Sequence, residues 1–153
     1  MPIFKRADTS HFLEISALDR VAWKNNRNSE YIPDGEHAWR IWVEHALVFV
    51  AIEDDCVVGA ILAFPCLSGE YCLHKVFVST PYRGKGIASL LFEELFRALD
   101  KTDIACFLTV DPFNEAALQL YSNWGFCERT FVEGYYRSNE NRFVLRRPPS
   151  RLD

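Results

Sequence analysis

The sequence predicts an α+β fold: a central mixed, mostly antiparallel sheet flanked by helices. Three observations lead to this prediction. Apolar residues recur at helical spacing over 87–101, β-rich runs separated by an acidic turn signal fill 47–65, and helical and strand-like segments alternate through the rest of the chain. With 153 residues the chain can bury one sizeable core, so we expect a single domain over residues 1–153.

Two helices are expected before the first of these strands. The stretch 11–23 (HFLEISALDRVAW) places apolar residues on one helical face: Phe12, Ile15, Leu18, Val21 and Ala22. A polar loop marked by proline and glycine follows. Residues 36–46 (EHAWRIWVEHA) then predict a second helix with Trp39 and Trp42 facing inward.

The remaining elements are expected in the order strand, strand, strand, helix, strand, helix, strand, strand. Their ranges are 47–65 (two strands), 71–79, 87–101, 104–110, 115–124, 126–136 and 141–147. Glu53-Asp54-Asp55 is the hairpin signal between the first two strands. Gly125 stands where a left-handed C-cap would end the last helix.

Composition and charge exclude several classes of function. The net charge of −4 favours no polyanionic nucleic acid as the main partner, and no stretch approaches the roughly 18 apolar residues of a membrane span. The N-terminus lacks the apolar region of a signal peptide, so a cytoplasmic location is expected. The five cysteines show no metal-binding spacing, so we expect no metal and interpret the cysteines as reduced core residues.

A basic glycine-rich hexad, Arg83-Gly84-Lys85-Gly86-Ile87-Ala88, lies between a predicted strand and a predicted helix. It does not have the spacing of a Walker loop. It matches a dinucleotide fingerprint only in part, although Asp111 lies at about the distance of a ribose-binding acid. It does fit an anion-binding turn, because Gly86 allows close approach of the backbone and the helix N-terminus adds partial positive charge. A plain helix-entry turn is the alternative.

A second motif extends this pattern. From Asn114 the chain reads NEAALQLYSNWGF, and the two motifs together resemble those of the GNAT superfamily of N-acetyltransferases. The resemblance covers about residues 47–136 and implies the GNAT acyl-CoA N-acyltransferase fold, with acetyl-CoA as co-substrate. Taken separately, Asn114 could be a helix N-cap and Tyr121 a core aromatic.

The resemblance also implies roles for individual residues. The backbone of Val76, Phe77 and Val78 would pair with the pantetheine arm, and a bulge there would supply an oxyanion donor worth about 3 kcal/mol. The implied pyrophosphate-binding residues are Arg83, Gly84, Lys85, Gly86, Ile87, Ala88 and Ser89. Asn114 would bond the cofactor arm, and Tyr121 would protonate the departing sulfur as general acid.

The general base is left open by the sequence. His74 is a candidate because histidine has a suitable pKa, although a strand histidine is more often structural. Cys72 shares its face of the strand, while Glu70 and Glu133 are further candidates, and Glu36 and His37 are weaker ones. In ribosomal-protein N-terminal acetyltransferases, which the chain somewhat resembles, a glutamate stands at the position of Thr109, and threonine cannot serve as that base.

The acceptor pocket is predicted only in outline. Tyr135 and Tyr136 would line it, or would form a strand pair with one ring in the core. Asp34 and Glu36 would attract a cationic amine, while Tyr31 and Trp39 would stack against it, unless this segment is merely a solvated loop.

The sequence is therefore interpreted as an enzyme, an acetyl-CoA-dependent N-acetyltransferase acting on a primary amine of a small molecule, peptide or protein. Direct attack in a ternary complex is the expected mechanism. The alternatives are a non-catalytic acyl-CoA sensor of the same fold and a nucleotide-binding oxidoreductase fragment. Neither nucleic acid nor membrane is an expected partner, and a homodimer is left open.

Overall fold

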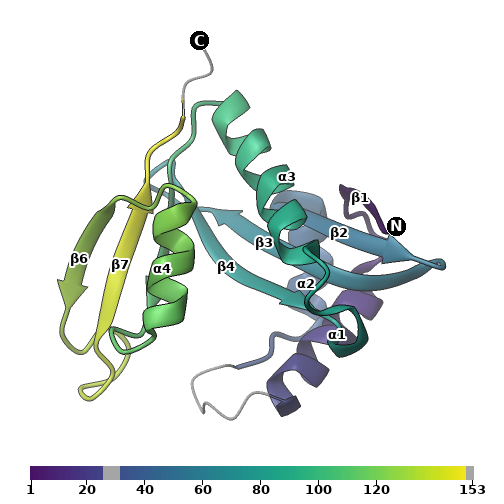
Figure 1. Ribbon diagram of the computed structural model, residues 1–153, viewed down its shortest axis with the longest axis horizontal. Coiled ribbons are helices and arrows are strands. Elements are labelled where there is room, and N and C mark those ends of the chain that lie inside the picture. The colour runs from purple at the N-terminus through teal and green to yellow at the C-terminus, as the bar shows by residue number, and fades with distance from the viewer. Residues whose placement is uncertain (26–31, 151–153) are drawn as a thin grey trace. The chain divides into compact units, whose positions relative to one another are not determined.

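The computed structural model describes residues 1–25 and 32–150. Tyr31, one of the residues predicted to contact the acceptor, lies outside them. The chain divides into two compact units, the first comprising Met1–Phe64 and His74–Ala98 and the second Pro65–Leu73 and Leu99–Asp153. One seven-stranded sheet has the order β1-β2-β3-β4-β5-β7-β6 (Figure 1), and β4 contributes residues to both units.

The elements follow the predicted order closely. They are β1 (Ile3–Arg6), α1 (Phe12–Asn25), α2 (Glu36–His45), β2 (Leu47–Glu53), β3 (Cys56–Pro65), β4 (Tyr71–Val78), a 3₁₀ turn (Thr80–Tyr82), α3 (Ile87–Lys101), β5 (Cys106–Val110), α4 (Glu115–Asn123), β6 (Glu128–Val132) and β7 (Arg142–Arg147). Strand pairing is antiparallel between β1 and β2, β2 and β3, β5 and β7, and β6 and β7, while β4 and β5 are parallel. The predicted α+β fold is confirmed. No helix among residues 1–25 and 32–150 is long and apolar enough to cross a membrane.

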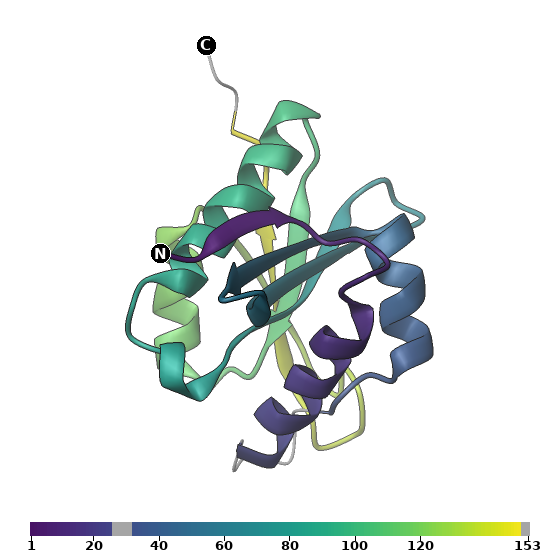
Figure 2. The same cartoon turned by 90° about the vertical axis from the view of Figure 1, so that its right-hand side faces the viewer.

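The first unit has helices on both faces of its strands. Val48 and Val50 of β2 belong to one buried cluster with Ile15 of α1 and Trp39 of α2, and Figure 2 shows these two helices side by side. Successive strand residues point to opposite faces of the sheet, so Gly59 of β3 lies on the face opposite Val48 and Val50. A Cβ at Gly59 would come within 3.4 Å of both Ile87 and Leu91, which means that α3 packs closely there.

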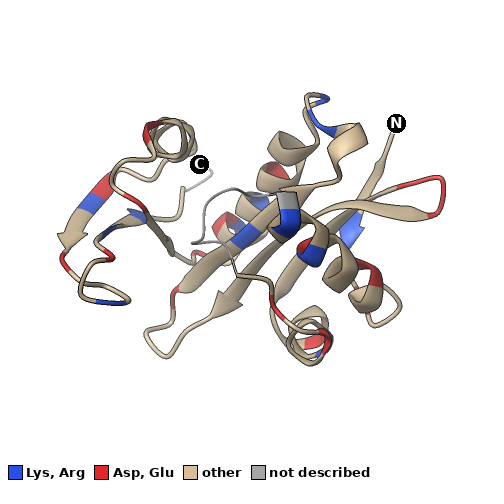
Figure 3. Ribbon diagram, turned by 90° about the horizontal axis from the view of Figure 1, so that it is seen from below, with Lys and Arg blue, Asp and Glu red and all other residues tan. Residues whose placement is uncertain are grey.

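The hairpin between β2 and β3 forms where the acidic signal predicted it. Glu53 pairs with Cys56, and the intervening Asp54 and Asp55 have φ of 52° and 60°. Positive φ at both central positions is typical of a type I′ turn, which aspartate tolerates better than most residues. This turn is the red tip next to the N-terminus in Figure 3.

In the second unit, Gly125 ends α4 as the sequence predicted. Its φ is +96°, its N–H donates to the Ser122 carbonyl, and the N–H of Phe126 donates to the Tyr121 carbonyl. These paired bonds form a Schellman motif, which satisfies carbonyls that the helix leaves without partners. The cap therefore fixes the end of α4, the helix that carries Tyr121.

The structure corrects the sequence analysis at three places. The strand β1 was missed, because its four residues are mostly exposed and show little apolar alternation. The predicted strand at 126–136 is shorter than expected: β6 ends at Val132, and Gly134 with φ of +61° turns the chain. Cys56 and Cys127 are exposed rather than core residues, although all five cysteines are free.

Candidate active site

The β4 strand presents alternating environments along 73–78. Leu73, Lys75 and Phe77 are buried, whereas Val76 and Val78 are half-buried and His74 is exposed. Since successive side chains alternate in a strand, His74, Val76 and Val78 share one face. The residues predicted to pair with pantetheine are therefore in the same strand as His74, in the first unit.

The glycine loop connects β4 to α3 within the first unit. Gly84 and Gly86 have φ of +76° and +80°, a backbone region that glycine adopts without strain. α3 begins at Ile87, and its first N–H groups point out of the helix without intrahelical partners. The loop is exposed, and a Cβ at Gly86 would meet nothing within 4 Å. An anion can therefore approach the N–H groups of this turn directly.

Two cations frame this loop. The Arg83 Nε donates to the Val78 carbonyl at 3.1 Å, which ties the loop back to the end of β4. The Lys85 ammonium lies 5.3 Å from the centre of the Tyr82 ring. Both side chains are exposed and would add positive charge for a bound phosphate.

The second motif forms α4 in the second unit. The Asn114 side chain accepts a hydrogen bond from the Ala117 N–H at 3.1 Å, so Asn114 is the N-cap of this helix. Tyr121 is half-buried, with its ring edge-on to Phe126 at 5.5 Å. Burial, with a smaller contribution from Cys106, raises the pKa of Tyr121 to about 12, so its hydroxyl keeps its proton at neutral pH. Asp111, the residue at the ribose-binding distance, instead accepts a hydrogen bond from the Phe113 N–H in a local turn.

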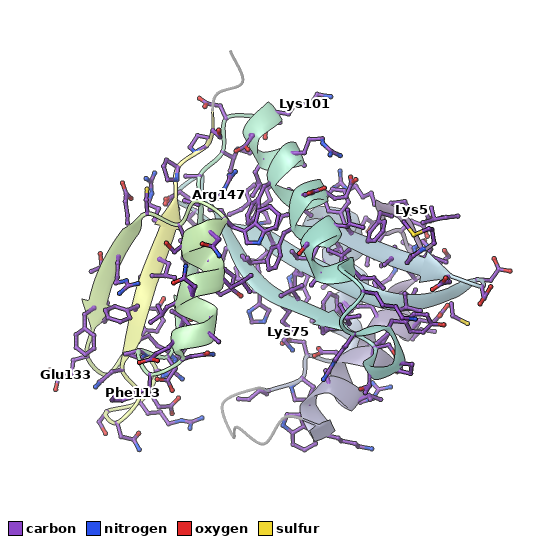
Figure 4. All side chains as sticks on the ribbon, in the orientation of Figure 1. Lys5, Lys75, Lys101, Phe113, Glu133 and Arg147 are labelled. Atoms are coloured by element: carbon purple, nitrogen blue, oxygen red, sulfur yellow. The ribbon has the colours of Figure 1, made fainter. Side chains whose placement is uncertain are left out.

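The candidate bases differ in whether their side chains are available to accept a proton. Both Glu70 carboxylate oxygens accept hydrogen bonds from Arg146, at 3.1 and 3.2 Å. Burial raises the pKa of the Cys72 thiol to about 12, so the thiol stays protonated. Glu133 is exposed in the turn after β6 and points outward in Figure 4. His74, in contrast, is exposed, and its Nε2 lies 3.0 Å from Asp34 Oδ2.

The residues predicted to form the acceptor pocket are only partly placed as expected. Glu36 is exposed at the start of α2, with Arg20 at 3.7 Å. Asp34 is not a free anion, because both Lys75 and His74 pair with it. Trp39 is fully buried and cannot stack against an acceptor.

Tyr135 and Tyr136 are exposed rings in a turn of the second unit, packed edge to face at 4.8 Å. The strand pair with one core ring is therefore wrong. The Tyr136 hydroxyl lies 2.7 Å from the Thr109 hydroxyl of β5. Thr109, which cannot act as a base, instead holds this ring in place.

Sequence reasoning missed a buried charge network in the first unit. The Lys75 ammonium donates to both carboxylate oxygens of Asp19 at 2.9 Å and contacts Asp34 Oδ2 at 2.8 Å (Lys75 in Figure 4). The Asp19 side chain is fully buried. The available signal was the lysine itself, a charged residue at an inward position of an apolar strand.

Comparison with known proteins identifies relatives of this chain. The model of the Acetyltransferase (GNAT) family matches residues 12–126. An N-alpha-acetyltransferase of Saccharolobus solfataricus is 30% identical over 113 residues, which cover 65% of this chain and 68% of that protein. The [ribosomal protein bS18]-alanine N-acetyltransferase of Escherichia coli K12 is 34% identical over 74 residues, covering 48% of this chain and half of that protein's length.

Solved structures share the fold. The ribosomal-protein-S18-alanine N-acetyltransferase of Escherichia coli aligns with a TM-score of 0.79 and 22% identity, over 100% of this chain and 97% of that one. A chain of the NatC complex bound to Gag peptide and CoA aligns with a TM-score of 0.74 and 23% identity, over 97% and 99%. At these identities the likeness extends to the fold alone.

The mostly antiparallel sheet excludes the oxidoreductase alternative, which would require a doubly wound parallel sheet.

Proposed function

This chain belongs to the GNAT acetyltransferase family, and we propose that it transfers an acetyl group from acetyl-CoA to a primary amine. The observation that supports this most directly is the Arg83–Ser89 turn. Two glycines at positive φ, flanking cations and the start of a 15-residue helix lie together in a short exposed segment. That donor set fits a pyrophosphate, which needs converging N–H groups and positive charge.

The coenzyme-binding residues are proposed as follows. The N–H groups of Gly84, Gly86 and the first turn of α3 would bind pyrophosphate oxygens, with Arg83 and Lys85 contributing charge. The backbone of Val76, Phe77 and Val78 would bind the pantetheine arm as an added strand. The Asn114 capping bond uses Oδ1, so its amide Nδ2 is the donor proposed to contact the arm.

Acetyl-CoA carries the acetyl group as a thioester, a form activated for acyl transfer. An N–H at the bulge proposed near Val76–Val78 would stabilise negative charge on the thioester carbonyl oxygen. A base must take one proton from the acceptor's ammonium, since only the neutral amine has a free lone pair. As the N–C bond forms and the C–S bond breaks, Tyr121 would protonate the sulfur. The nitrogen would lose a further proton to solvent to become an amide, and Tyr121 would regain its own proton from solvent.

The acceptor is proposed to be a peptide α-amine rather than a small molecule. The curated relatives support this choice, because one is named N-alpha-acetyltransferase and the other acts on an alanine of a ribosomal protein. The exposed Tyr135 and Tyr136 rings support it too, since aromatic side chains bind extended peptides well. Glu36 lies at the start of α2 and would contribute negative charge toward a cationic amine.

The proposal is tested by calorimetric titration with acetyl-CoA, CoA and NADH, followed by a thiol-release assay with peptides and small amines. Acetyl-CoA binding with acceptor-dependent thiol release is the expected result. Binding without turnover on any amine would favour the acyl-CoA sensor instead. Failure to bind CoA would show that the glycine loop has another role.

A further inference from the structure

The network in the first unit connects a buried charge pair to the exposed His74. Asp19 lies on α1, Lys75 on β4 and Asp34 immediately before α2. Besides Lys75, Asp19 Oδ2 accepts hydrogen bonds from the Asp34 N–H at 2.9 Å and from the Trp39 indole at 3.0 Å. Each partner compensates a carboxylate that would otherwise be costly to bury.

This network fixes the segment before α2 against β4. Lys75 donates to the Ile32 carbonyl at 2.7 Å, in addition to its contacts with both aspartates. The Asp34 backbone is thus held through its N–H and its side chain through Lys75. Rigid support of this kind lets one carboxylate oxygen keep a defined position relative to β4.

The position of that carboxylate determines which nitrogen of the neutral His74 ring carries the hydrogen. Burial alone would raise the pKa of Asp34, but hydrogen bonds from His74 and Lys75 hold it below its ordinary value. Asp34 is therefore ionised at neutral pH and acts as an acceptor, which places the ring proton on Nε2. In the neutral form of the ring, Nδ1 then carries the lone pair.

Aromatic rings hold the imidazole from two other sides. The centre of the His74 ring lies 5.6 Å from the centre of the Trp42 ring of α2 and 5.5 Å from that of the Phe64 ring of β3. Both contacts are edge-on. Within residues 1–25 and 32–150, Asp34 pairs with His74 directly, Lys75 pairs with Asp34, and Asp19 pairs with Lys75 behind it. This arrangement leaves an exposed ring with one paired nitrogen.

We propose that Asp34 is a positioning residue that orients His74 as the general base, and that the buried Asp19–Lys75 pair fixes Asp34. The proposal rests on the proposed acetyl transfer. His74 Nδ1 takes a proton from the acceptor's ammonium, and the imidazolium so formed is stabilised by Asp34 through Nε2–H. The proton passes to solvent before the next turnover, so no further reactant is required. His74 is two residues from Val76, about 7 Å along the strand.

The test uses His74→Gln, Asp34→Asn and the control His45→Gln, which changes an exposed histidine at the end of α2. The measurements are kcat and KM between pH 5 and 9, acetyl-CoA affinity, and the tautomer of His74 by ¹⁵N NMR. We expect His74→Gln to lower kcat about 100-fold or more and to abolish the acidic limb of the pH profile. The acetyl-CoA affinity of His74→Gln should be unchanged, and so should the kcat of the control His45→Gln.

Asp34→Asn should lower kcat at least about 10-fold and reduce the Nε2–H tautomer, an effect that a purely structural role would not produce. His74→Gln keeps the buried network intact, so it tests the base even if Asp34→Asn folds poorly. An undiminished kcat in His74→Gln would overturn this proposal but not the proposed acetyl transfer. An unchanged His74 tautomer in a folded Asp34→Asn would do the same. Absence of thiol release from the unmodified protein would overturn the proposed function as well.

Discussion

Arg147 of β7 forms a two-point ion pair with Asp100, near the end of α3. Nη1 lies 2.7 Å from Oδ1 and Nη2 lies 2.8 Å from Oδ2, and both side chains are largely buried (Arg147 in Figure 4). The Arg147 Nε also donates to the Trp124 carbonyl at the C-cap of α4. One guanidinium therefore joins the ends of α3 and α4 within the second unit. Two parallel hydrogen bonds between a guanidinium and a carboxylate are the strong form of such an ion pair.

Replacing Asp100 with asparagine should destabilise the protein. The change leaves a largely buried guanidinium without its counter-charge, a loss of about 3 kcal/mol. Urea unfolding at pH 7 measures the effect, with Asp103→Asn as a control at an exposed neighbouring residue. Equal unfolding midpoints for the two variants would contradict the prediction.

The same pair predicts a pH dependence. Hydrogen bonding to Arg147 lowers the pKa of Asp100, so its stabilisation is complete above the ordinary value of about 4 and is lost as pH falls through the lowered value. The unfolding free energy of the unmodified protein should decline below about pH 4 more steeply than that of Asp100→Asn. Parallel curves would assign the acid sensitivity to other groups.

Gly86→Ala should weaken coenzyme binding specifically. Alanine at φ of +80° is strained by about 1–3 kcal/mol, and relief of that strain would move the N–H groups of the loop. Gly69→Ala is the matched control, because Gly69 has φ of +87° and equally open surroundings but lies in the β3–β4 connection. Calorimetry should show acetyl-CoA affinity falling at least about tenfold in Gly86→Ala only. Similar affinities in both variants would remove the loop from the binding site.

Tyr121→Phe should lower kcat about 100-fold or more, since it removes the proposed proton donor while keeping the ring. Acetyl-CoA affinity should change little, and the ring should keep its packing against Phe126. Steady-state thiol release and calorimetry separate the two effects. An unchanged kcat would exclude Tyr121 from the mechanism.

Tyr136→Phe should raise the KM for a peptide acceptor several-fold, with kcat and acetyl-CoA affinity retained. The hydroxyl bond to Thr109 fixes the exposed ring, and a bond of this kind contributes about 1 kcal/mol. Thr109→Val removes the same bond from the other side, so the double variant should be no worse than either single one. Additive effects would mean that the two residues act independently.

The sequence by itself determined the elements that depend on local chemistry. Helical spacing predicted α3, the acidic pair predicted the β2–β3 turn, and Gly125 predicted the end of α4, because each signal acts within a few residues. The two motifs also predicted the family, since the spacing of their residues is itself a sequence property.

Tertiary structure decided what depends on residues far apart in the chain. Asp34 was expected to attract an amine, yet Lys75, 41 positions later, neutralises it and His74 pairs with it. Likewise, β1 is a strand because β2 offers it an unpaired edge, and Thr109 holds Tyr136 across 27 positions. Pairing of this kind depends on distances that the fold sets, so a local pattern can mark a residue such as Lys75 as unusual but cannot identify its partners.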